Sequence, residues 1–129
     1  MAFTAELCQT FAPIIQDATT FEEVPVGWHR LVEDLMARLV TTLAGEPGIR
    51  LIVRQIKEKF GGLRFYYRLA PEIDRENPTA KAIRALVDEA ESKSLHTCDT
   101  CGSAGLLREG SGWYATRCDE HADRDMQPA

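Results

Sequence analysis

The chain of 129 residues has little of what marks a membrane-spanning, secreted or disordered protein. No run of residues approaches the roughly 18 consecutive apolar side chains of a membrane-spanning helix. The N-terminal residues lack a basic stretch followed by an apolar one, so we expect no secretory leader. Apolar residues make up 44% of the chain and charged residues 27%, which are ordinary values for a globular protein. We therefore expect one folded domain with a modest core.

Cysteine is also scarce, with four residues in the whole chain. Three of them lie with a histidine at metal-ligand spacing, which argues against the disulfides of a small secreted protein. We therefore expect a cytoplasmic protein. The fourth, Cys8, falls on the apolar side of a short helix that we expect from Thr4 to Asp17, with a kink or a second turn at Pro13. We predict that it is a small buried side chain.

The spacing of apolar residues predicts two further helices and a β-hairpin. One helix extends from about Gly27 to Leu43, where a segment with two glycines and a proline ends the pattern. The other begins at Asn77-Pro78, a capping residue followed by proline, and runs to about Ser94. Between them, residues 49–56 are rich in β-branched side chains and residues 63–69 alternate, with a Gly-Gly pair before the second run. These two runs predict an antiparallel hairpin.

A metal-binding motif lies near the C-terminal end. Cys98 and Cys101 are separated by two residues, and Cys118 and His121 repeat that spacing. Three thiolates and one imidazole fill the tetrahedral shell of Zn²⁺ and leave no position for a substrate water. We therefore predict one structural zinc ion bound by these four side chains. A disulfide or a Cys-x-x-Cys redox pair is the alternative interpretation, and His96 is a competing ligand with a less suitable spacing.

The segment between the ligand pairs predicts a second hairpin around Glu109-Gly-Ser-Gly112. A knuckle, a hairpin and then a helix that opens with the last two ligands is the layout of a treble-clef finger. A second knuckle in place of that helix would make a zinc ribbon. The predicted fold class is α+β: helices packed on a β-hairpin (residues 1–96), with a treble-clef-like or zinc-ribbon-like module (residues 97–122) packed on them in one compact domain. We expect residues 123–129 to be a flexible tail.

Few residues are arranged for catalysis. A treble-clef nuclease needs a general-base histidine on its hairpin, and residues 106–117 contain none. The remaining polar pair, His29 and Glu33, lies one helical turn apart and is typical of a solvated surface. The sequence therefore favours a binding protein over an enzyme.

Positive charge is concentrated in one segment. Residues 50–68 contain six cations and Glu58, a net charge of +5, which leaves −10 for the rest of a chain whose net charge is −5. This segment is interpreted as the solvated face of a sheet, as a nucleic-acid surface, or as a surface for a protein partner. The overall acidity favours the protein partner over nucleic acid. The candidate partner-binding residues are Arg54, Lys57, Lys59, Arg64, Tyr66, Arg68 and Trp113.

Four motifs resemble a family of small uncharacterised phage and prophage proteins. They are Gly27-Trp28, Lys57-Glu-Lys-Phe-Gly-Gly-Leu-Arg-Phe65-Tyr66, Cys98-x-x-Cys-Gly102 and Gly112-Trp113-x-x-Thr-x-Cys118-x-x-His121. The resemblance implies an accessory protein of the host cytoplasm. Its leading expected role is to bind a host protein, as an inhibitor of a defence or regulatory system. The alternative is a nucleic-acid-binding zinc protein that uses residues 50–68.

Overall fold

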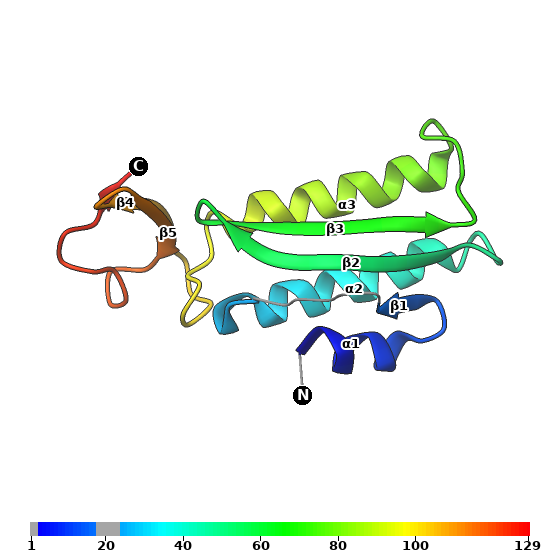
Figure 1. Cartoon of the computed structure of the whole chain (residues 1–129), viewed down its shortest axis with the longest axis horizontal. Helices are drawn as coiled ribbons and strands as arrows, with labels where there is room; N and C mark the ends of the chain where they lie inside the picture. The colour runs from blue at the N-terminus through cyan, green and yellow to red at the C-terminus, as the bar shows by residue number, and fades with distance from the viewer. Residues whose placement is uncertain (1–2, 18–23) are drawn as a thin grey trace.

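The computed structural model describes residues 3–17 and 24–129, and in these residues the strands form two small sheets. The larger sheet has the order β1-β2-β3, with strands Ile15–Asp17, Arg50–Lys59 and Gly62–Ala70. The smaller sheet has the order β5-β4-β6, with strands Trp113–Arg117, Leu106–Gly110 and Gln127–Pro128. Figure 1 shows the smaller sheet beyond the end of the larger one, next to the turn between β2 and β3.

Helices line one side of the larger sheet. Helices α2 (His29–Leu43) and α3 (Pro78–Ser94) run beside each other along the β2–β3 hairpin, and α1 (Phe3–Phe11) packs near β1 (Figure 1). A 3₁₀ turn, η1 (Val26–Trp28), leads into α2. None of the helices in the described residues is long and apolar enough to cross a membrane. The α+β class predicted from the sequence is confirmed.

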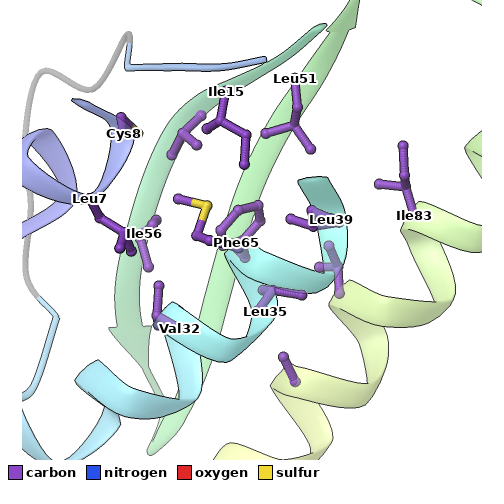
Figure 2. Close-up of a cluster of buried hydrophobic side chains, with 14 of the residues drawn as sticks. Leu7, Cys8, Ile15, Val32, Leu35, Leu39, Leu51, Ile56, Phe65 and Ile83 are labelled. Carbon is purple, nitrogen blue, oxygen red and sulfur yellow. The ribbon is translucent and has the colours of Figure 1, made fainter. Parts of the chain in front are cut away.

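The hydrophobic core lies between the helices and the inner face of the hairpin. Figure 2 shows side chains of α1, α2, α3 and the three strands turned toward one another, among them Leu35, Ile56, Phe65 and Ile83. The apolar stripe predicted for residues 27–43 supplies much of this core. Cys8 is buried within it, as expected.

Helix α3 begins as the sequence predicts. The side-chain oxygen of Asn77 accepts hydrogen bonds from the backbone N–H groups of Thr79, at 2.8 Å, and Ala80, at 3.4 Å. Pro78 occupies the first turn, where a helix does not need its missing N–H group. These contacts satisfy donors that would otherwise have no partner within the helix.

The prediction of one N-terminal helical segment to residue 17 was wrong. Helix α1 ends at Phe11, and the chain then forms strand β1, which pairs in parallel with β2. Pro13 cannot donate a backbone hydrogen bond and disfavours helical geometry at the residue before it. The side chain of Ile15 is fully buried opposite Leu51, so packing against a distant strand determines the conformation of this short segment.

The free edge of β3 is protected by α3. The backbone N–H of Leu63 donates to Ser94 Oγ at 2.9 Å, and the backbone N–H of Phe65 donates to Glu91 Oε2 at 2.9 Å. Ser94 Oγ in turn donates to the carbonyl oxygen of Glu91 at 2.6 Å. Two donors of an edge strand are therefore satisfied by side chains, which makes them unable to pair with another chain.

We expect the Ser94→Ala substitution to destabilise the protein by about 1–3 kcal/mol, because it leaves the buried Leu63 N–H without an acceptor. The Ser92→Ala variant is the matched control, since Ser92 lies in the same helical turn but is exposed. Urea unfolding of both variants measures the difference. Equal stability of the two would contradict the role assigned to Ser94.

The turn between β2 and β3 places a large apolar side chain in an unfavourable backbone conformation. Phe60 and Gly61 have φ values of 53° and 85°, typical of a type I′ turn, and Glu58 Oε2 accepts a 2.7 Å hydrogen bond from Gly61 N. Type I′ turns favour asparagine or glycine at the position of Phe60. The Phe60 side chain is nevertheless 67% exposed, with Lys59 Nζ 5.6 Å from its ring centroid.

We expect Phe60→Asn to stabilise the protein by about 1 kcal/mol, because asparagine adopts a positive φ at lower cost. The Phe60→Ala variant also removes the exposed ring but keeps the unfavourable conformation, so it should give no such gain. Thermal unfolding of the two variants separates the two effects. A loss of stability in Phe60→Asn would show that the ring contributes to the fold.

Candidate metal centre

Four side chains at the C-terminal end point their donor atoms at a common centre. The donor atoms of Cys98, Cys101, Cys118 and His121 all lie within 4.8 Å of one another. The Cys101 and Cys118 sulfurs are 3.8 Å apart, and His121 Nδ1 lies 3.8 Å from Cys98 Sγ and 3.2 Å from Cys118 Sγ. Two sulfurs bound to one tetrahedral zinc ion lie about 3.8 Å apart. The group can therefore hold one metal ion, and its donor set favours zinc.

Each ligand pair lies on a tight turn. In the first, the N–H of Gly102 donates to the carbonyl of Cys98 at 2.9 Å, and Gly102 has a φ of 80°, which glycine adopts at little cost. In the second, the N–H groups of His121 and Ala122 donate to the carbonyl of Cys118 at 3.2 and 3.0 Å. Two facing turns connected by a hairpin are the arrangement given above for the zinc-ribbon alternative.

The helix of the treble-clef interpretation is not formed. Residues after Cys118 turn back instead, and β6 pairs with β4 through the residue pairs Gln127–Glu109 and Pro128–Arg108. Residues 127 and 128 of the predicted flexible tail thus form the third strand of the smaller sheet, and the Met126 side chain before them is buried. Three aspartates between residues 119 and 125 disfavour a helix interior, and the pairing with β4 favours an extended chain.

The environment of the sulfurs differs between the ligands. Burial raises the pKa of the Cys98 thiol, but the backbone N–H groups of Cys118, Cys101 and Thr100 outweigh it and lower the pKa from 9.0 to about 6. Burial raises the pKa of Cys118, and its neighbouring thiols raise it further. Since the thiolate is the form that binds metal, the backbone prepares Cys98 in particular as a ligand.

Two arginines connect the turns to the smaller sheet. Arg117 pairs with Asp99 in the first turn at 3.2 Å and with Asp123 after the second at 3.7 Å. Arg108 donates from Nη2 to Asp119 at 2.9 Å and from Nε to the carbonyl of Arg117 at 2.8 Å. These contacts fix the separation of the ligand pairs, and neither arginine was singled out in the sequence.

The module is attached to the rest of the fold through the motifs that carry the family resemblance. The N–H of Gly27 donates to the carbonyl of Asp99 at 2.8 Å, and Trp28 Nε1 donates to the carbonyl of Thr97 at 2.9 Å. On the other side, Thr116 Oγ1 donates to the carbonyl of Gly61 at the tip of the β2–β3 hairpin, at 2.7 Å. The motifs thus meet at one interface around the ligand turns.

Six of the seven predicted partner-binding residues, all except Trp113, fall on one open face. The side chains of β2 and β3 that point away from the core form this outer hairpin face, whose charged and aromatic members are Arg50, Arg54, Lys57, Lys59, Arg64, Tyr66 and Arg68. Arg54 is the extra residue of a β-bulge, so Gln55 rather than Arg54 lies opposite Tyr66. Lys57 Nζ lies 5.9 Å from the ring centroid of Tyr66.

Within the described residues, the cations of this face have no ion-pair partner. Among residues 3–17 and 24–129, the ion pairs within 4.0 Å involve Arg38, Lys81, Arg108 and Arg117, and none involves a cation of the outer hairpin face. Lys57 and Arg64 are directly opposite each other in the register. Trp113 lies elsewhere, on β5, where the Arg117 guanidinium is 5.2 Å from its ring centroid.

The other singled-out histidines take different positions. The ring of His29 stacks on Phe3 at a centroid distance of 3.8 Å, and its Nε2 lies 3.1 Å from the carbonyl oxygen of Val24. It therefore connects α1 to α2, whereas the sequence suggested a solvated pair with Glu33. His96 lies outside the ligand group, as does Cys8.

Comparison with known proteins gives no further guide to this arrangement. No protein-family model, no curated protein and no solved structure matches the chain, so the resemblance to phage and prophage proteins stays a prediction. The function is therefore inferred from the ligand group, from the outer hairpin face and from the contacts between them.

Proposed function

We propose that the protein is a zinc-stabilised, non-enzymatic binding protein whose outer hairpin face binds an acidic surface of another protein. The observation that carries the proposal is the row of cations on this face, none of which has an ion pair within the described residues. Zinc has a structural role in this proposal, because four protein ligands complete a tetrahedral shell.

The arrangement of the cations does not serve the stability of the fold. Lys57 and Arg64 are direct cross-strand neighbours, and like charges at such positions destabilise a sheet. Phe60, at the tip of the same hairpin, adds an exposed apolar side chain in an unfavourable conformation. Features that cost stability and lie together on one surface are typical of a binding site.

The type of side chain favours a protein partner. Arginine and tyrosine are enriched among residues that dominate the energy of protein interfaces, and Tyr66 lies among Arg54, Lys57 and Arg64. The rest of the chain carries a net charge of −10, which would repel a polyanion beyond the face itself. An acidic protein patch of matching size meets the cations without that cost.

The family resemblance adds the biological setting of the proposal. A phage or prophage accessory protein acts in the host cytoplasm, where a small inhibitor of a defence or regulatory protein needs a binding surface and no active site. A row of cations on such an inhibitor would accelerate its encounter with an acidic target.

The test uses a photo-crosslinking amino acid at position 66 in bacterial cells. We expect a discrete protein adduct that disappears in the Lys57→Glu/Arg64→Glu variant. The Arg75→Glu/Arg124→Glu variant changes the net charge equally at exposed positions outside the face and should keep the adduct. An adduct unaffected by the first variant, or no protein adduct at all, would contradict the proposal.

Nucleic-acid binding is the second candidate, favoured by the same row of cations around a half-exposed tyrosine ring. It predicts that labelled single-stranded or duplex DNA binds the purified protein with an affinity that falls steeply between about 50 and 200 mM salt. In the Lys57→Glu/Arg64→Glu variant, the logarithm of the affinity should then fall less steeply with the logarithm of the salt concentration. Binding of this kind without a protein adduct would favour the second candidate over the first.

A further inference from the structure

A cavity of about 440 Å³ lies between α2 and α3, on the side of the two helices that faces away from the hairpin. Its floor is apolar and consists of Leu31 and Leu35 from α2 and Leu86 and Ala90 from α3. Val26, at its border, is 72% exposed. This groove is separate from the outer hairpin face, and neither the metal centre nor the proposed partner surface explains it.

Protein side chains and backbone border both ends of the groove. At one end Arg38 Nη1 and Glu89 Oε1 form an ion pair of 3.1 Å between the two helices. At the other end the first ligand turn, residues 100–102, forms the wall. A partner helix, about 10 Å across, needs open ends to lie along such a groove. The bordered ends and the volume instead fit a small molecule, whose sites span about 300–1,000 Å³.

The charges of the groove are unequal along its length. Arg30 and Lys93 border it near the ligand turn, and neither has an ion pair in the part of the chain that the structure describes. The acidic residues are Glu89, which is paired with Arg38, and Asp34, one turn farther along α2 than Arg30. The end next to the ligand turn therefore offers two cations for one anionic group.

We propose that this groove binds a small amphipathic carboxylate, with its carboxylate between Arg30 and Lys93 and its aliphatic chain over Leu31, Leu35 and Leu86. From Arg30 to Arg38 helix α2 rises about 12 Å, which is close to the length of a ten-carbon chain. Because the first ligand turn forms one wall, the metal centre supports the site. This proposal is independent of a partner on the outer hairpin face.

The test is a titration of the zinc-loaded full chain with sodium decanoate, followed by backbone amide NMR. We expect saturable shifts with one site per chain, centred on residues 30–35, 86–93 and 100–102. The Arg30→Gln/Lys93→Gln variant should weaken binding at least tenfold, since it removes two charge-assisted contacts from exposed positions. The Arg64→Gln/Arg68→Gln variant, altered on the outer hairpin face, should bind like the wild type.

Two further titrations sharpen the result. Decyltrimethylammonium has the same chain with a cationic head group, and it should bind at least tenfold more weakly than decanoate. A peptide that ends in leucine presents the carboxylate on a larger body. Equal or tighter binding of this peptide would contradict a small free carboxylate as the ligand and would indicate the C-terminus of a polypeptide instead. Absence of saturable shifts with decanoate at millimolar concentration, or unchanged affinity in the Arg30→Gln/Lys93→Gln variant, would overturn the proposal.

Discussion

Removal of the metal is expected to unfold residues 97–129 while the helices and the β2–β3 hairpin remain folded. The large hydrophobic cluster of the protein includes buried residues only up to Ala90, so the C-terminal module does not share it. Within the module the buried apolar side chains are those of Cys98, Ala115 and Met126. A core of this size cannot hold a segment of this length, whereas a structural zinc site contributes about 10–16 kcal/mol of binding free energy that is available for folding.

Hydrogen exchange measured with and without a strong chelator tests this expectation. The amides of β4, β5 and β6 should lose their protection together, and those of α2 and β3 should keep most of theirs. The Cys98→Ala variant should reproduce the chelated state, and the Cys8→Ala variant, which alters a cysteine in the main core, should bind one zinc ion like the wild type. A module that keeps its protection after chelation, or wild-type protein that contains no zinc, would contradict a structural zinc ion.

The parts of the fold that could be predicted from the sequence are those determined by neighbouring residues. The stripe of α2 repeats over four turns, and Asn77-Pro78 combines two independent helix-start preferences. The hairpin was predicted from the Gly-Gly pair, although the structure places the turn at Phe60-Gly61 and begins β3 at Gly62. Local patterns of this kind depend on the period of the chain and on turn chemistry, both of which a single sequence contains.

The parts that could not be predicted depend on residues far apart. Strand β1 has three residues and acquires its conformation by pairing with β2, across a separation of about 36 residues. Strand β6 has two residues and pairs with β4. For the metal ligands, the spacing between Cys118 and His121 is compatible with either a helical turn or an isolated turn. The donor set could therefore be predicted, but the element that carries it could not.

The structural role of the four motifs could not be predicted from the sequence either. Gly27, Gly61 and Thr116 were singled out through a resemblance, which indicated that they matter but not how. In the structure they join the ligand turns and the smaller sheet to the main core, so part of the Lys57–Tyr66 motif serves packing. Lys57 and Arg64 have no such contact, and they are the members of that motif that the proposed binding function needs.

The substitution Gly27→Ala is expected to cause a large loss of stability. A Cβ atom at this position would lie 2.1 Å from the carbonyl oxygen of Cys98 and 2.5 Å from the carbonyl carbon of Asp99. Both are backbone atoms of the first ligand turn, so no side-chain rotation relieves the overlap. Either the ligand turn moves away from η1 or the ligands move out of position, and we expect a cost of about 3 kcal/mol or more.

The Gly45→Ala variant is the matched control, because its Cβ would meet nothing closer than the carbonyl oxygen of Thr42 at 3.5 Å. It should be neutral or slightly stabilising, since alanine restricts the unfolded chain. Urea unfolding measures both variants, and competition with a zinc-binding dye measures their metal affinity. Since the overlap involves the ligand turn itself, Gly27→Ala should weaken zinc binding as well as stability. A Gly27→Ala protein with wild-type stability and zinc affinity would show that the first ligand turn does not depend on its contact with η1.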